Sequence, residues 1–178
     1  MPETTPPPSP TERTLVVMRH AKAEQAAPTD AERPLAERGH VDAEAAGRWL
    51  AEQGVHPDAA LVSAARRTEE TYAAVARGAG WDLAPTLEPG LYAAGPEAAV
   101  DLVRLVDDEV RTLVVIGHNP TMGSLALLLD DGTGDADASA VAAQGFPTSA
   151  LVVFAYDGSW ADLAPGTASL TASHVGRG

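Results

Sequence analysis

Apolar residues along this chain fall into two alternating patterns, short unbroken runs and runs at helical spacing. The short runs predict buried strands at residues 14–18, 58–64, 112–116 and 149–158, with a candidate edge strand near 168–172. Helical spacing predicts helices at residues 40–53, 66–80, 97–109 and 121–130. We expect loops at residues 82–97, with at most one short strand, and at residues 130–139.

This alternation predicts an α/β fold, a three-layer sandwich with a largely parallel central sheet and helices on both faces. The length of 178 residues fits one domain, which we place at residues 13–178. The first twelve residues are rich in proline and are expected to form an extended, disordered tail.

Composition narrows the range of partners. Twelve Lys and Arg against 25 Asp and Glu give a formal charge of −13, which disfavours nucleic acid and anionic membrane as partners. The absence of cysteine excludes disulfides and thiolate chemistry. The sequence shows neither a signal peptide nor a membrane-length apolar run, so a cytoplasmic location is expected, with a monomer as the working expectation.

Both of the most apolar strands end in a histidine. Residues 14–18 are followed by Arg19 and His20, and residues 112–116 by Gly117 and His118. Asn119 then suits a helix N-cap, with Pro120 in the first turn. Because ligands of open α/β sheets bind beyond the carboxyl ends of the strands, we expect both histidines at one site.

A pair of arginines belongs to the same predicted edge. Arg66 and Arg67 open the helix that follows residues 58–64, although the helix dipole disfavours a cation there. Taken alone, the pair is typical of a solvated helix end, paired with Glu69 or Glu70. Together with Arg19 and the two histidines, a bound phosphate is the better explanation for one of them, because a guanidinium binds phosphate in bidentate fashion.

Two histidines and two arginines without cysteine or a metal-binding motif suit phosphoryl transfer through a phosphohistidine. A neutral imidazole is a competent nucleophile near pH 7. The arginines would stabilise charge on the phosphoryl oxygens, and a second histidine, expected to be protonated, would add to it without a metal ion. Arg19 would thus bind the group that His20 attacks.

Three stretches together resemble the histidine phosphatase superfamily, the phosphoglycerate-mutase-like or RHG fold. They are "VMRHA" (17–21), "LVSAARRTEET" (61–71) and "VIGHNPTM" (115–122), supported by "RPLAERG" (33–39) and "FPTSAL" (146–151). The similarity spans residues 14–156, and within the superfamily the chain resembles small bacterial phosphohistidine phosphatases, which act on histidine-containing phosphotransfer domains.

The resemblance implies roles for individual residues. His20 matches the nucleophile, Arg19 and Arg67 the two phosphate clamps, and His118 the second pocket histidine. Arg66 would then be a neighbour of the clamp, since the family's spacing places the clamp four residues before a threonine, here Thr71. No metal and no cofactor are implied, and Ala21 replaces the family's usual glycine.

The identity of a general acid decides between substrates. Relatives that act on phosphate esters carry a glutamate to protonate the leaving alkoxide, and Glu88 is the nearest candidate, although a surface glutamate explains it equally well. Expelling imidazole needs less help, so protein phosphohistidine is the expected substrate, with a small phosphate ester as the alternative. Lys22 and Asn119, close in sequence to the two histidines, are further candidate substrate-binding residues.

Other functional interpretations are weaker. A non-catalytic phosphate-binding or phosphohistidine-binding module would need cations but no nucleophile, so the presence of both His20 and His118 disfavours it. The acidic segment 130–139 does not match the calcium-loop pattern, and His40, His56 and His174 lack partners at metal spacing.

Overall fold

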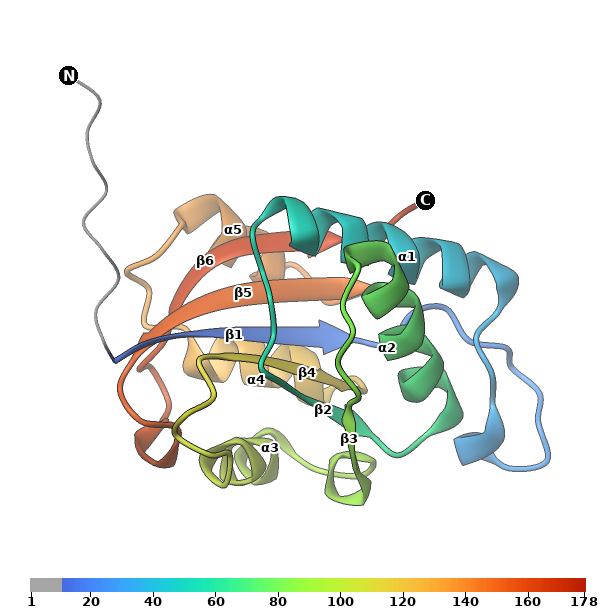
Figure 1. Cartoon of the computed structure of the whole chain (residues 1–178), viewed down its shortest axis with the longest axis horizontal. Coiled ribbons are helices and arrows are strands. Elements are labelled where there is room, and N and C mark those ends of the chain that lie inside the picture. Colours follow the sequence, from blue (N-terminus) through green and yellow to red (C-terminus); the bar gives the residue numbers. More distant parts are fainter. Residues whose placement is uncertain (1–10) are drawn as a thin grey trace.

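A computed structural model describes residues 11–178 and shows six strands in one sheet, in the order β3-β2-β4-β1-β5-β6 (Figure 1). The strands are β1 (Glu12–Arg19), β2 (Ala59–Ser63), β3 (Thr86–Glu88), β4 (Thr112–Gly117), β5 (Ala150–Asp157) and β6 (Ser169–Val175). β3, β2, β4 and β1 are parallel to one another, whereas β5 is antiparallel to β1 and β6 to β5. The predicted α/β sandwich is therefore confirmed, with a mixed sheet whose parallel part contains the first four strands.

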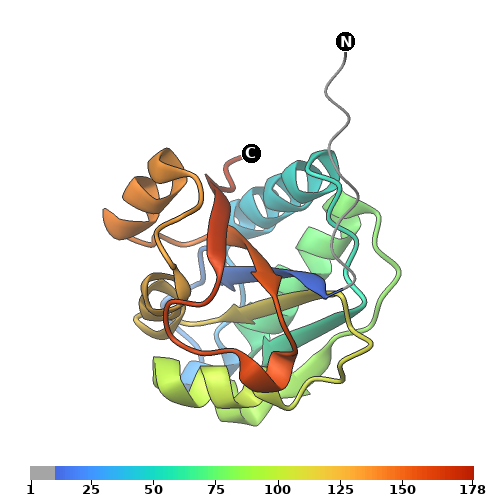
Figure 2. The same ribbon diagram turned by 90° about the vertical axis from the view of Figure 1, so that its left-hand side faces the viewer.

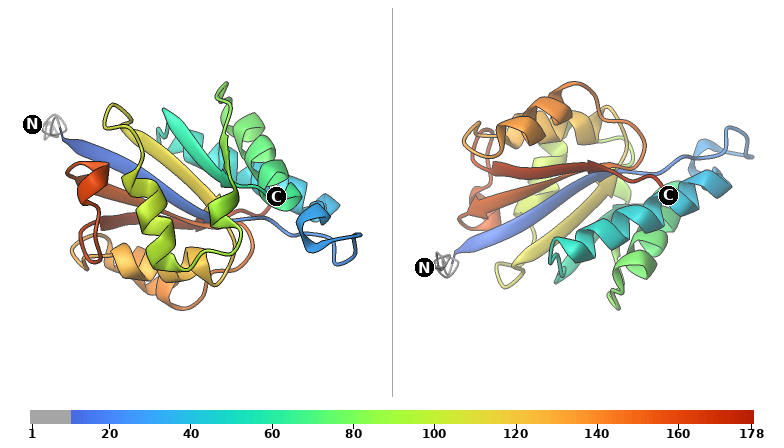
Figure 3. Two further views of the ribbon diagram at one scale, coloured as in Figure 1. Left: turned by 90° about the horizontal axis from the view of Figure 1, so that it is seen from below. Right: turned by 90° about the horizontal axis from the view of Figure 1, so that it is seen from above.

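Helices cover both faces of this sheet (Figures 2 and 3). They are α1 (Glu37–Glu52), α2 (Arg66–Ala79), α3 (Pro96–Arg104), α4 (Thr121–Leu129) and α5 (Ala136–Ala143), with 3₁₀ turns η1 (Asp30–Glu32), η2 (Pro89–Leu91) and η3 (Trp160–Asp162). α1 and α2 share a core with one face, and α3, α4 and α5 share a core with the other.

The central part of β1, residues 15–18, is uniformly apolar because it is buried on both faces of the sheet. Val16 and Met18 point into the core under α1 and α2, whereas Leu15 and Val17 point into the opposite core. All four side chains are fully buried. A strand buried on both faces needs no polar alternation, which is what residues 14–18 predicted.

Two sequence predictions, one of a helix and one of a loop, need correction. The helix predicted at residues 97–109 ends at Arg104, and Leu105, counted as part of its apolar face, is 83% exposed. The loop predicted at 130–139 contains the start of α5, whose amide at Ala138 donates to the carboxylate of Asp135. α5 buries only alanines, Ala138 and Ala142, so its apolar face is weak in the sequence.

Two predicted boundaries also shift. Pro120, not Asn119, is the N-cap residue of α4, although the Asn119 side chain accepts a hydrogen bond from Gly123 N at 3.1 Å. At the N-terminus, β1 begins at Glu12, which pairs with Asp157 of β5. Residues 1–10 of the predicted disordered tail lie outside the described residues.

Close packing of α1 on α2 fixes the position of α2, whose first turn contains Arg67. A Cβ atom added to Gly47 of α1 would lie 2.0 Å from the carbonyl oxygen of Val75. One added to Gly78 of α2 would lie 2.1 Å from the carbonyl oxygen of Glu44. Both glycines therefore allow backbone-to-backbone contact that no other residue permits.

We predict that Gly47→Ala destabilises the protein by about 1–3 kcal/mol, because two helix backbones must separate. Alanine is intrinsically the better helix former by about 1 kcal/mol, so the sign of the effect distinguishes packing from propensity. Urea unfolding measures it, with Gly95→Ala as control, since a Cβ there meets nothing nearer than 3.7 Å. A gain in stability for Gly47→Ala contradicts the packing argument.

Candidate active site

The register of β1 on β4 brings the two predicted histidines together. Arg19, the last residue of β1, lies opposite Gly117, the last residue of β4, and His20 N donates to Gly117 O at 3.0 Å. The centroids of the His20 and His118 rings are 5.4 Å apart, with the planes inclined at 59°. Two histidines 98 positions apart in sequence thus share one edge of the sheet.

His20 has the tautomer of a nucleophile. Its Nδ1 lies 2.7 Å from the carbonyl oxygen of Ala21, and because that oxygen only accepts, Nδ1 carries the hydrogen. The lone pair of the neutral ring is then on Nε2. Burial above all, partly offset by the hydrogen bond to Ala21 and reinforced by the neighbouring His118, Arg67 and Arg19, lowers the pKa of His20 to about 4. His20 is therefore neutral at pH 7.

The backbone around His20 is fixed on both sides. The hydroxyl of Thr71 accepts from Ala21 N at 3.0 Å and donates to Arg67 O at 2.6 Å. On the other side, Ser149 N donates to His20 O at 3.1 Å. Ser149 has φ 64°, a conformation that disfavours a side chain, at the turn that delivers this amide.

His118 is held by a buried serine. Ser63 Oγ, at the end of β2, lies 2.7 Å from Nε2 of His118. Its Nδ1 is buried without a hydrogen-bond partner among residues 11–178. Burial first, then the Arg67 charge, lowers the pKa of His118 to about 4. This lowered pKa favours the neutral ring over the protonated form considered from the sequence, because burial beside two guanidinium groups disfavours a third positive charge.

Arg19 and Arg67 complete the cluster. Arg19 donates through Nη1 to Phe146 O at 3.2 Å, and Arg67 donates through Nη1 and Nη2 to Asp30. The Nε atom of each arginine is buried and has no partner in the described part of the chain. We call Arg19, His20, Arg67 and His118 the anion cradle, since its unpaired buried N–H donors suit the oxygens of a tetrahedral anion.

The other predicted site residues lie at the margins. Arg66 is exposed and pairs with Glu70 at 2.9 Å, as expected for a neighbour of the clamp. Lys22 is exposed. Asn119 donates to Phe146 O at 2.6 Å, so it joins α4 to the loop before β5. Glu88 accepts from Gly90 N at 2.8 Å and thereby caps η2.

Sequence analysis did not identify Asp30, Tyr92 or Ser63 as site residues. Asp30 binds Arg67, and the Tyr92 ring lies edge-on to His118, with centroids 5.4 Å apart. Both residues lie in segments of loop character, where no periodicity marks a buried partner. Ser63 is the last residue of the apolar strand β2, and this position at the edge of the sheet is the one feature of the sequence that indicates a place in the site.

Residues 11–178 contain no group of three or more His, Asp or Glu side chains placed to hold a metal ion. In the same range, no helix combines the length and apolar character needed to span a membrane.

The chain is similar in sequence to known proteins. A model of the histidine phosphatase superfamily (branch 1) matches residues 15–92. An uncharacterized protein of Mycobacterium tuberculosis (strain H37Rv) is 40% identical over 164 residues, covering 90% of this chain and all of that protein. The phosphohistidine phosphatase SixA of Escherichia coli K12 is 30% identical over 120 residues, covering 66% of this chain and 74% of SixA.

Two solved structures of SixA proteins superpose on this chain. A candidate phosphohistidine phosphatase SixA from Nakamurella multipartitia superposes with a TM-score of 0.82 at 31% identity, covering 93% of this chain and 96% of the other. A protein histidine phosphatase SixA complexed with tungstate superposes with a TM-score of 0.70 at 25% identity, covering 91% and 96% of the two chains.

We predict that both histidines titrate near pH 4 rather than near the ordinary value of 6.5. Imidazole NMR signals, assigned with His20→Ala and His118→Ala, measure the midpoints. Because the unfolded chain binds these protons at higher pH, the free energy of unfolding should fall as the pH drops from about 6.5 towards 4. A midpoint at or above 6.5 for either ring contradicts the assigned charge states.

Proposed function

The chain belongs to the histidine phosphatase superfamily, and from this premise we propose that it is a metal-independent phosphatase that hydrolyses protein phosphohistidine through a covalent phosphohistidine at His20. Its family membership supports phosphatase activity in general. The observation that carries the mechanism is the buried, neutral His20, whose Nε2 lone pair belongs to the same cluster as the unpaired Nε–H donors of Arg19 and Arg67 and the unpaired Nδ1 of His118.

The proposed reaction has two displacements at phosphorus. First, Nε2 of His20 attacks, a new N–P bond forms, and the P–N bond of the substrate breaks. The substrate imidazole, protonated on its other nitrogen, leaves as a neutral ring. Second, water attacks the phosphoryl group, its proton passes to solvent, and the bond to Nε2 breaks. Inorganic phosphate is released and His20 is regenerated.

His118 contributes a neutral hydrogen-bond donor in this scheme. If Ser63 donates to Nε2, the hydrogen of the His118 ring lies on Nδ1, the nitrogen that is otherwise unpaired. That N–H then donates to a phosphoryl oxygen. A bound dianion raises the pKa of His118, so the ring gains a proton only when negative charge is present to stabilise it.

The carboxyl groups near the cradle favour a phosphoramidate over an ester. Asp30 is the carboxylate in contact with Arg67, and its hydrogen bond from Tyr92, together with Arg33 and Arg67, holds its pKa well below the usual range. It therefore has no proton to give at neutral pH. Glu88 is engaged in capping η2. Alkoxide needs an acid in order to leave, whereas the imidazole of phosphohistidine does not.

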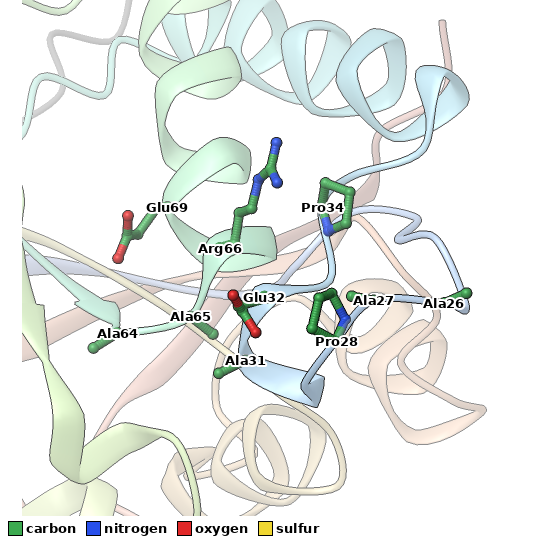
Figure 4. Close-up of a pocket in the computed structure, with 10 residues that line it drawn as sticks. All are labelled: Ala26, Ala27, Pro28, Ala31, Glu32, Pro34, Ala64, Ala65, Arg66 and Glu69. Carbon is green, nitrogen blue, oxygen red and sulfur yellow. The ribbon is translucent and has the colours of Figure 1, made fainter.

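An open groove beside the clamp supports a polypeptide substrate (Figure 4). Its volume is about 720 Å³, and it lies between the loop that contains η1 and the start of α2. The groove is lined by Ala26, Ala27, Pro28, Ala31, Glu32, Pro34, Ala64, Ala65, Arg66 and Glu69. None of the four cradle residues lines the groove, but Ala31 and Arg66 are the sequence neighbours of Asp30 and Arg67, so the two segments that meet at the clamp also form its walls. The groove has room for residues that flank a phosphorylated histidine.

The relatives support the same proposal. SixA of Escherichia coli is a phosphohistidine phosphatase, and the tungstate complex shows that a related structure binds a tetrahedral oxyanion. Tungstate resembles phosphate in shape and charge.

We predict that His20→Ala lowers turnover of phosphohistidine by roughly a thousandfold or more, because the nucleophile is lost. Release of inorganic phosphate from phosphohistidine and from a sugar phosphate measures it, with exposed His56→Ala as the matched control. Labelled substrate should leave an acid-labile phosphoryl group on His20. Faster hydrolysis of the sugar phosphate favours the small-ester alternative, and unchanged function in His20→Ala identifies a binding module.

We also predict that Ala26→Trp, which fills the groove, lowers kcat/KM severalfold for a phosphorylated phosphotransfer domain. Free phosphohistidine, which does not occupy the groove, should be hydrolysed at the normal rate. The ratio of the two kcat/KM values is therefore the measurement. An equal effect on both substrates, or on neither, argues against the groove as the place where the polypeptide binds.

A further inference from the structure

We propose that Asp30 is a positioning residue for the reaction: with Tyr92 it holds the Arg67 guanidinium so that its Nε edge faces the phosphoryl group, and it ties Arg67 to His118. The inference rests on the proposed function only in taking the bound anion to be a phosphoryl group. We refer to Asp30 and Tyr92 together as the bracket.

Asp30 occupies one edge of the guanidinium. Arg67 Nη1 donates to the main-chain oxygen of Asp30 at 2.7 Å, and Nη2 donates to its Oδ2 at 3.0 Å. A guanidinium has five N–H donors in a rigid plane. With the two Nη atoms engaged at this end, the Nε–H, buried and unpaired within residues 11–178, remains for a phosphoryl oxygen. Asp30 thus sets the plane in which Arg67 meets the anion.

Tyr92 extends this contact to the second histidine. Its hydroxyl donates to Asp30 Oδ2, the same oxygen that Arg67 binds. The Arg67 Cζ atom lies 5.9 Å from the centroid of the Tyr92 ring, and the His118 ring lies 5.4 Å from it at 76°. One aromatic ring therefore contacts both the clamp and the histidine that line the cradle.

The bracket is itself anchored. Arg33 donates through Nη1 to Asp30 Oδ1 at 3.1 Å and through Nε to Glu24 O at 2.7 Å. Arg33 N also donates to Asp30 O at 3.2 Å. Both carboxylate oxygens of Asp30 are thereby engaged although the side chain is 55% exposed, whereas the Arg67 side chain is 7% exposed. The partly exposed carboxylate of Asp30, fixed at both oxygens, thus orients the buried guanidinium of Arg67.

An effect of the Asp30 charge and an effect of Arg67 positioning predict opposite changes in phosphate affinity when Asp30 is neutralised. Asp30 is negative and near the cradle, so its neutralisation should strengthen anion binding if Coulomb repulsion dominates. If Asp30 acts by orienting Arg67, the same change should weaken binding, because the guanidinium loses its fixed plane.

The experiment measures the affinity of the full-length protein for inorganic phosphate by calorimetry, which needs no turnover. We expect Asp30→Asn and Tyr92→Phe each to weaken phosphate binding severalfold and to lower kcat for phosphohistidine, with the melting temperature unchanged. The Nε–Hε NMR signal of Arg67 should broaden or shift in Asp30→Asn. Asp101→Asn is the matched control, since Asp101 pairs with Arg104 at 2.9 Å on an exposed face of α3.

A double-mutant cycle separates positioning from a general structural effect. Lysine has no planar fork to orient, so Asp30→Asn should have little effect on phosphate affinity in an Arg67→Lys background. Tighter phosphate binding by Asp30→Asn, or an equal effect in both backgrounds, overturns the inference. If the protein instead fails to hydrolyse phosphohistidine while the phosphate-binding cycle behaves as expected, the proposed function fails and the role of Asp30 stands.

Discussion

The in-register parallel pairing of β1 with β4 is the constraint on which the candidate active site depends. Side chains alternate along a strand, so a shift of one residue would turn His20 or His118 to the other face and exchange every buried residue with it. Both strands are buried on both faces, and the two cores leave no room for such a shift. The apolar packing that stabilises the sheet therefore also sets the distance between the two imidazoles.

Burial then gives the cradle its chemical character. The chain as a whole carries a formal charge of −13, yet at this edge it places the buried Arg67 and the half-buried Arg19 beside two buried imidazoles. Two fixed positive charges and low solvent access keep both rings neutral, as their pKa values of about 4 indicate. A neutral His20 is a nucleophile, and buried N–H groups without partners gain most from an anion. The unpaired buried donors of Arg19 and Arg67 thus suit a phosphoryl group.

The central strands and the two histidines could be predicted from the sequence, because an apolar run and the residues that follow it are local features of the sequence. Residues 14–18 and 112–116 predicted their strands, and the histidines that follow them lie side by side. α5 could not be predicted, since alanines among acidic residues carry little periodic signal. Asp30 was missed for a different reason: its partner Arg67 is 37 residues away, and a contact between a loop region and the first turn of a helix leaves no periodic pattern in either.

The state of the carboxylates around the cradle bears on which leaving groups the proposed reaction can expel. Asp30 is held ionised by Tyr92 and two arginines, and Glu88 is used to cap a turn, so the described residues place no free acid against His20. Under the proposed function, a site of this kind favours substrates whose leaving group needs no proton from the protein. Selectivity among such substrates must then come from contacts outside the cradle. The groove beside Arg67 is where the chain offers them, because the first turn of α2 contributes both to its wall and to the clamp.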